Sequence, residues 1–248
     1  LISISNEIHI DKCPFCYLQN NNKQLKFIGI NIKFYKNDQW IQNESDCNPN
    51  VFNQESLFKN FTEFTIEESS TKICPLLFTN VRFDKFKLIY DNSMNEISYV
   101  DTDHDPNATI RTVDLKGFKR LSRFYFNKYL FKNSEDIHIH SSEVNIDDDA
   151  LDDFMNLRKI QVFDYSNSTI QTFYSTHKTL LRNLRQKSFN SVSEFNLDHL
   201  MRNRLVIQFD SESEFKDEDI CLFKDFPHDR LIIIYERSLR KDIIDCNS

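Results

Sequence analysis

Two consecutive segments of the sequence carry the same spacing of apolar residues, and this repeat restricts the fold more than any other feature. The two segments share the pattern F-x-x-L-x-x-I-x-I, with Ser134 at the leucine position of the first and Val162 at the last position of the second, and the second begins 23 residues after the first. The matching residues are Phe131, Ser134, Ile137 and Ile139 in the first segment and Phe154, Leu157, Ile160 and Val162 in the second. Residues two apart point to the same side of a strand, whereas residues three apart share one side of a helical or 3-10 segment. Because one such turn cannot bury its own apolar side, the repeat predicts a stack of turns.

Pairs of apolar residues separated by one position extend this repeat in both directions along the chain. The pairs are Leu88 and Tyr90, Val113 and Leu115, Leu205 and Ile207, and Leu231 and Ile233. A less clearly defined turn falls around residues 180–184. About seven strands at intervals of about 20 to 28 residues lie within the range of known repeat folds.

These units resemble leucine-rich repeats. Leu157, Ile160, Val162 and Ile170 match the L-x-x-L-x-L part of that pattern, and Tyr165 stands where the family has an asparagine. The resemblance implies an α/β solenoid with short parallel strands and helical or irregular return segments. The missing asparagine implies degenerate repeats, since the family's asparagine ladder satisfies backbone groups at the convex turn. A generic α/β or α+β fold is the alternative.

The cysteines lie near the two ends of the chain and indicate terminal caps. They are Cys13, Cys16, Cys47, Cys74, Cys221 and Cys246. We expect disulfides, although a redox pair or half of a zinc site at residues 13–16 and unpaired thiols remain alternatives, and the connectivity is open. By resemblance to extracellular leucine-rich repeat proteins, we expect an N-terminal cysteine-containing cap over 1–74, degenerate repeats over 75–220 and a C-terminal cap over 221–248.

The composition argues against several classes of protein. Gly29 and Gly117 are the only glycines, whereas dinucleotide fingerprints, P-loops and nucleophile elbows each need several. A net charge of −7 argues against nucleic acid or anionic lipid as a partner. No apolar run is long enough to span a bilayer, so we expect no membrane insertion within this chain, and its first residues predict a mature or trimmed N-terminus.

The segment IHIH is the first candidate for metal chemistry. His138 and His140 would point to the same face of a strand, next to the aligned residues of the two neighbouring strands. Those aligned residues would be Asp114, Lys116, Gln161 and Phe163. Because this set includes a lysine and a phenylalanine, we expect no metal and no other cofactor. A solvated strand face is the plain interpretation, and contact with a ligand is the functional one.

The acidic run that follows is the second candidate. Its residues are Asp147, Asp148, Asp149, Asp152 and Asp153. A calcium loop needs a central glycine and a distal bidentate glutamate, which this segment lacks. We expect these aspartates to cap and open a return helix that carries Leu151, Phe154 and Leu157.

A solenoid presents an extended concave surface of the kind that binds proteins or peptides. We therefore predict a non-catalytic extracellular binding module, such as the ectodomain of a receptor or adhesion protein, whose oligomeric state the sequence leaves open. The predicted contact residues are Asp114, Lys116, His138, His140, Gln161 and Phe163. The glycosylation sequons are compatible with this location, but composition alone would produce about as many; they are Asn43, Asn60, Asn107 and Asn167. An intracellular leucine-rich repeat adaptor or substrate-recognition subunit and a divergent enzyme are the alternatives.

Overall fold

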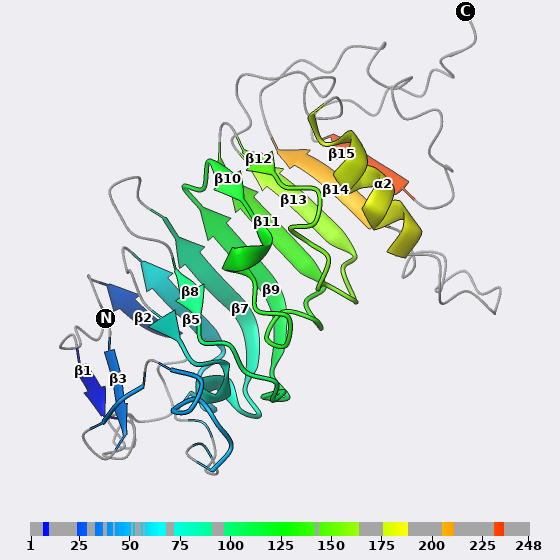
Figure 1. Ribbon diagram of the computed structural model, residues 1–248. Helices are drawn as coiled ribbons and strands as arrows, with labels where there is room; N and C mark the ends of the chain where they lie inside the picture. The colour runs from blue at the N-terminus through cyan, green and yellow to red at the C-terminus, as the bar shows by residue number, and fades with distance from the viewer. Residues whose placement is uncertain are drawn as a thin grey trace, which may run out of the picture.

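A computed structural model shows a solenoid built on one parallel sheet (Figure 1). It describes residues 7–9, 24–28, 33–36, 39–41, 43–50, 52, 56, 58–67, 72–90, 97–141, 144–163, 176–187, 205–210 and 231–235. The eight strands of this sheet are β2 (Gln24–Ile28), β5 (Glu63–Glu67), β7 (Arg82–Ile89), β9 (Thr109–Lys116), β11 (Asp136–His140), β13 (Lys159–Phe163), β14 (Leu205–Asp210) and β15 (Leu231–Tyr235). They lie side by side in chain order, and every pair is parallel. The predicted solenoid with short parallel strands is confirmed.

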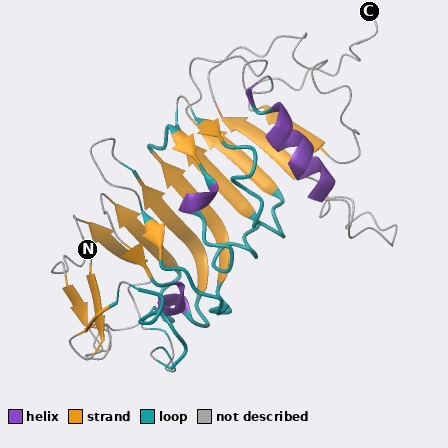
Figure 2. Ribbon diagram, viewed as in Figure 1, coloured by secondary structure: helices purple, strands orange, loops and turns teal. Residues whose placement is uncertain are grey.

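The return segments between these strands form a second layer of short strands, turns and 3-10 helices. This layer contains two parallel pairs, β6 (Lys72–Ile73) with β8 (Ser98–Tyr99) and β10 (Arg120–Leu121) with β12 (Asn145–Ile146). Its 3-10 helices are η2 (Pro75–Phe78) and η3 (Arg123–Tyr125). The α/β prediction with helical or irregular returns is thus not supported in its helical part for the described turns up to β13, because the structure there is mostly strand (Figure 2).

A smaller sheet lies at the N-terminal end of the solenoid. It consists of β1 (Glu7–His9), β3 (Lys33–Lys36) and β4 (Gln39–Trp40). Strand β3 pairs in parallel with β1 and antiparallel with β4, and the Lys33 ammonium lies 4.6 Å above the Trp40 ring. This sheet falls within the region predicted as a cap, although the boundaries of the three predicted regions stay predictions.

The alignment of the central strands follows the sequence repeat. Ile137 pairs with Val113 on one side and Ile160 on the other, and Ile139 pairs in the same way with Leu115 and Val162. The repeat-derived alignment of β9, β11 and β13 is confirmed.

The predicted alignment is two residues off at both outer positions. Leu88 pairs with Leu115, so the residues equivalent to Val113 and Leu115 are Phe86 and Leu88, and Tyr90 lies beyond the strand. In β14, Ile207 pairs with Ile160 and Phe209 with Val162. The predicted pair, Leu205 and Ile207, therefore begins two residues too early. The predicted match between the last two strands is correct, since Leu205 pairs with Leu231 and Ile207 with Ile233.

Between β13 and β14 the described chain forms α2 (Lys178–Lys187), where the sequence indicated a turn around residues 180–184. Leu180 and Leu181 are buried, and His177 just before the helix accepts a hydrogen bond at Nε2 from the Ile146 amide, at 3.0 Å. Asn183 Nδ2 donates to the Asp148 carbonyl at 3.1 Å. These contacts place α2 beside β12, as a helical continuation of the return layer.

Aromatic residues fill the space between the two layers. Phe131 and Phe154, the equivalent residues of the two repeat units, are stacked with ring centroids 6.1 Å apart and an interplanar angle of 22°. Phe86 contacts Phe131 edge-on at 5.4 Å, which links these rings to the aromatic residues of the N-terminal turns. The other buried phenylalanines in contact with this group are Phe58, Phe64, Phe78, Phe83 and Phe126. Burial of such rings is the dominant source of stability in a stacked fold.

Three turns in the described part of the chain contain a residue with a left-handed backbone. Gly117 has φ +82°, and a Cβ there would lie 2.1 Å from the Tyr90 carbonyl oxygen, so glycine alone fits. Asn80 and Asn107 have φ of 57° and 54°, and Asn107 Nδ2 donates to Asn80 Oδ1 at 2.9 Å. A second pair, Asn156 Nδ2 to Asn133 Oδ1 at 3.2 Å, lies before the next two strands. Asparagines thus pair at the edge where strands begin; Tyr165 and Ile170 lie outside the described residues.

Replacing Asn107 by alanine should lower the free energy of unfolding by roughly 1–2 kcal/mol, because alanine tolerates the left-handed backbone poorly and loses the side-chain hydrogen bond. Urea titration followed by circular dichroism measures this loss. Asn107→Gly keeps the backbone freedom and should lose less. Equal losses in the two variants would contradict a role for the backbone conformation.

Candidate functional site on the polar face of the sheet

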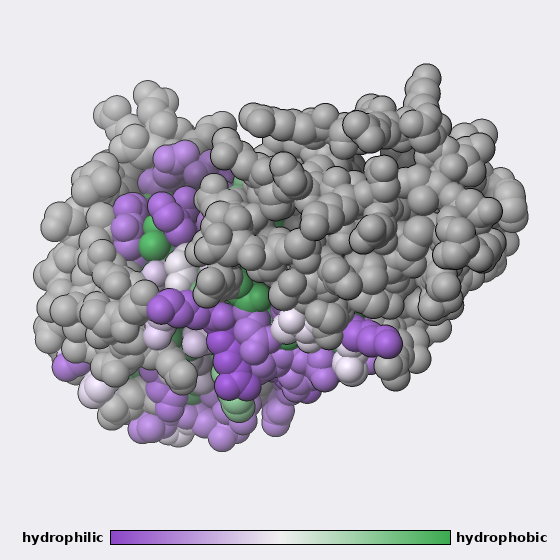
Figure 3. Space-filling view, turned by 90° about the horizontal axis from the view of Figure 1, so that it is seen from above, coloured by the Kyte–Doolittle hydropathy of each residue, from purple (hydrophilic) through white to green (hydrophobic). Residues whose placement is uncertain are grey.

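One face of the sheet packs on the core, and the other carries polar side chains because residues alternate along each strand. We call the part of it formed by β7, β9, β11 and β13 the central polar face. Its polar and aromatic residues are Lys85, Lys87, Thr112, Asp114, Lys116, Asp136, His138, His140, Lys159, Gln161 and Phe163, and Ile89 of β7 occupies the same row as Lys116. Seen from above, the described surface of the molecule is mainly hydrophilic (Figure 3).

The alignment brings the predicted contact residues together. His138 pairs with Asp114 in β9 and with Gln161 in β13. His140 occupies the next position and pairs with Lys116 and Phe163. All of the predicted residues therefore lie in two adjacent rows across three strands; their role in binding stays a prediction.

Three aromatic rings in contact form the centre of this face. The rings of His140 and Phe163 lie 4.3 Å apart and are almost parallel, at 3°. His138 approaches the same phenylalanine edge-on at 5.6 Å. Together the three rings form a firm, partly exposed surface, and aromatic side chains of this kind are frequent anchors in protein interfaces.

Asp114 is more deeply placed than a solvated strand face would allow. It is only 3% exposed, with Lys85 Nζ at 3.5 Å and Lys87 Nζ at 4.0 Å from Oδ2. Nε2 of His140 lies 3.2 Å from Oδ1 without the geometry of a hydrogen bond, so Oδ1 is buried without a partner. Thr112 and Gln161 are buried as well, whereas His138 and His140, for which a solvated strand face was the plain interpretation, are half-buried.

Sequence reasoning missed Lys85 and Lys87, which lie on either side of Phe86 in the segment KFK. The observed alignment matches Phe86 and Leu88 with Val113 and Leu115 and so brings both lysines next to Asp114. The predicted alignment of Leu88 and Tyr90 with the same two residues does not. The alternation of lysine with apolar residues is thus visible in the sequence, but alternation alone does not fix the register.

Burial lowers the pKa of His138 below its usual value, since desolvation disfavours the charged ring. The Asp114 carboxylate opposes this effect, and Lys85 reinforces it. The folded protein therefore prefers the neutral form of His138 more strongly than the unfolded chain does.

Acidification should consequently weaken the fold through His138. Above the usual histidine pKa of about 6.5 both states hold the ring neutral, and as the pH falls through that value the unfolded chain gains its proton while the folded chain, with its lowered pKa, does not yet do so. We expect the free energy of unfolding to fall more steeply as the pH drops below about 6.5 in the wild type than in His138→Gln. Urea titrations across this range test the difference, and parallel curves would contradict it.

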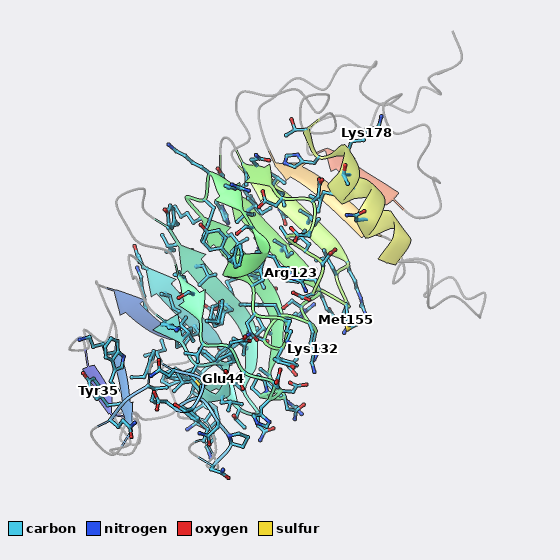
Figure 4. The ribbon with its side chains drawn as sticks, in the orientation of Figure 1. Tyr35, Glu44, Arg123, Lys132, Met155 and Lys178 are labelled. Atoms are coloured by element: carbon cyan, nitrogen blue, oxygen red, sulfur yellow. A yellow bond between two sulfur atoms is a disulfide. The ribbon has the colours of Figure 1, made fainter. Side chains whose placement is uncertain are left out.

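The acidic run does not open a helix. Residues 147–153 form successive turns, with the Ala150 amide donating to the Asp147 carbonyl at 3.0 Å, so the predicted capping role is wrong. Asp147 and Asp153 instead form bidentate ion pairs with Arg120 and Arg123 of the preceding turn, at 2.8–3.0 Å. Figure 4 shows Arg123 among the return segments. These aspartates tie two consecutive turns together.

The remaining predicted positions are distributed as follows. Cys47 and Cys74 form a disulfide with a Cα–Cα distance of 5.6 Å, and Cys13, Cys16, Cys221 and Cys246 lie outside the described residues. Asn43, Asn60 and Asn107 are exposed, and Asn167 lies outside the described part of the chain.

Within the residues that the structure describes, no group of three or more His, Cys, Asp or Glu is placed to hold a metal ion. Nor does any helix in these ranges have the length and apolarity to cross a membrane.

Comparisons with protein-family models, curated proteins and solved structures return no match to this chain. The fold and the site define it as a parallel-strand solenoid that carries a polar sheet face with a stacked aromatic centre.

Proposed function

We propose that this chain is a non-catalytic module that binds a protein or peptide on its central polar face. The observation that carries the proposal is the continuous parallel sheet, on which Asp114, His138, His140, Gln161 and Phe163 fall into register. Side chains fixed by a sheet lose little conformational entropy when they bind, which favours affinity. The stacked pair of His140 and Phe163 offers an aromatic anchor at the centre.

The proposal includes a degenerate leucine-rich repeat as the type of solenoid. Aligned residues on β5, β7, β9, β11 and β13 are separated by 22, 27, 24 and 23 residues, close to the repeat length of that family. Short returns with 3-10 turns, in place of long helices, also occur in such repeats.

We also propose that the module acts outside the cell or at the cell surface. The disulfide between the buried residues Cys47 and Cys74 supports this location, because such bonds persist in oxidising compartments. The intracellular adaptor predicts reduced cysteines in the native protein. Counting free thiols by mass spectrometry of protein purified without reductant separates the two.

Selection of peptides from an unbiased displayed library on the full chain tests the binding function. We expect the selected peptides to bind the variant His138→Ala/Phe163→Ala at least tenfold more weakly, because both aromatic contacts are lost. The free energy of unfolding should change by less than about 1 kcal/mol, since both side chains are partly exposed.

Phe124→Ala is the matched control, because Phe124 is 84% exposed and lies in η3 of the return layer, away from the central polar face. Its affinity for the selected peptides should equal that of the wild type. Peptides whose binding survives the double variant but fails with Phe124→Ala would place the binding surface elsewhere.

A further inference from the structure

The central polar face differs in charge from the chain as a whole. It carries four lysines against two aspartates, a net charge of +2, whereas the whole sequence has −7. The lysines are Lys85, Lys87, Lys116 and Lys159, and the aspartates are Asp114 and Asp136. A positive patch on an acidic protein attracts negatively charged groups and repels positively charged ones.

These lysines keep much of their capacity to bind an anion. Lys85 and Lys87 share a single carboxylate oxygen of Asp114, at 3.5 and 4.0 Å, which is longer than a charge-assisted hydrogen bond. Within the described part of the chain, neither Lys116 nor Lys159 takes part in an ion pair. Each ammonium group has three donors, so donors remain for a ligand carboxylate.

The flanking strand β5 does not cancel this charge. It contributes Glu63 and Glu67, and Lys26 of β2 forms an ion pair with Glu67. Glu63 alone is left beside Lys85, its aligned neighbour. Three of the four lysines are therefore gathered on β7 and β9, next to the aromatic centre on β11 and β13.

The spacing on a sheet suits a peptide in extended form. Neighbouring strands lie about 5 Å apart, and alternate residues of one strand lie about 7 Å apart. Alternate side chains of an extended peptide are also about 7 Å apart, so two of its carboxylates can reach lysines on β7 and β9 together.

We propose that the central polar face binds an extended acidic segment of a partner protein. Its carboxylates pair with Lys85, Lys87 and Lys116, and an aromatic side chain of the segment packs on the stacked rings of His140 and Phe163. This inference rests on the binding function proposed above and specifies the chemistry of the partner.

The test uses two fluorescein-labelled eight-residue peptides, titrated with the full chain and followed by fluorescence anisotropy. The acidic peptide has Glu at positions 1, 3 and 7, Tyr at position 5 and Ser elsewhere, so that its carboxylates and its ring share one side of the extended chain, and the neutral peptide has Gln in place of each Glu. The acidic peptide should bind at least tenfold more tightly at 50 mM NaCl, and its affinity should fall at 300 mM NaCl as salt screens the charges. In Lys85→Gln/Lys87→Gln its affinity should fall at least fivefold.

The control Lys72→Gln/Lys119→Gln removes the same charge from two exposed lysines of the return layer and should stay within twofold of the wild type. Equal binding of the two peptides, or equal losses in the two lysine variants, would overturn the inference. Heparin that binds more tightly than the acidic peptide through Lys85 and Lys87 would overturn the assignment to a protein segment.

The unbiased library separates this inference from the function on which it rests. Selected peptides that depend on His138 and Phe163 but show no enrichment in Asp or Glu would leave the binding function standing and overturn the acidic partner. Both proposals would be overturned if the selected peptides bound His138→Ala/Phe163→Ala as tightly as the wild type and the acidic peptide bound Lys85→Gln/Lys87→Gln as tightly as the wild type.

Discussion

Phe131→Ala is expected to lower the free energy of unfolding by about 3–5 kcal/mol. Phe131 is fully buried, and its ring contacts Phe86, Phe126 and Phe154 at centroid distances of 5.4, 5.8 and 6.1 Å. These rings come from three consecutive turns, so the truncation leaves a cavity that backbone movement in one turn cannot fill. Urea titration of wild type and variant, each followed by circular dichroism and tyrosine fluorescence, measures the loss.

Two further variants show whether the effect comes from burial. Phe124→Ala removes the same atoms at a residue that is 84% exposed and should change stability by less than about 0.5 kcal/mol. Phe131→Leu keeps part of the volume and should fall between the wild type and Phe131→Ala. If both alanine variants lost the same stability, the stacked rings would not be the core of the solenoid.

The sequence predicts the centre of the solenoid well because the repeat there is fixed by two kinds of residue at once. Phe131 and Phe154 mark the return layer, and the isoleucine pairs mark the strands, so only one alignment satisfies both. The structure stacks these two phenylalanines and pairs Ile137 with Ile160.

The alignment is less well determined where only alternation is available. In β7 and the residue that follows it, the apolar side chains of Phe86, Leu88 and Tyr90 alternate with others, so a slip of two residues keeps every side chain on its own face. Pairing with β9 shows that Phe86 and Leu88 are the equivalent pair. Because this slip also moves Lys85 and Lys87 by one row, the same ambiguity hid two lysines of the candidate site.

The predicted return helix failed for a related physical reason. Leu151, Phe154 and Leu157 are three residues apart, a spacing that successive turns satisfy as well as a helix does. In the structure the amide of Phe154 donates to the carbonyl of Leu151, and Asp153 is engaged by Arg123 from 30 residues earlier. A long-range ion pair of this kind has no local pattern in the sequence from which to predict it.

The burial of Asp114 was likewise beyond prediction from local sequence. It depends on Lys85 and Lys87 from one neighbouring strand and His140 from the other, each fixed by the stacking of turns. Sequence periodicity predicts which residues share this face. The burial of each side chain depends in addition on residues of the two neighbouring strands.

Removal of the disulfide in Cys47→Ala/Cys74→Ala is expected to lower the free energy of unfolding by about 3.5 kcal/mol. The two cysteines are 27 residues apart, and a cross-link over a loop of that length restricts the unfolded chain by about this amount. Urea titration of the purified variant, without reductant so that other cysteines are undisturbed, measures the loss. The bond joins residues 43–50 to the segment between β6 and η2, so the N-terminal turns should open first, which amide hydrogen exchange can locate.

Ile73→Val separates the effect of the cross-link from that of packing. Ile73 is buried directly beside Cys74, and loss of one methyl group there should cost about 1 kcal/mol. The double cysteine variant should exceed this loss clearly, and its hydrogen exchange should quicken around β5 and β6 while β11 and β13 stay protected. A loss no larger than that of Ile73→Val would mean that the stacked turns hold the N-terminal end without the covalent link.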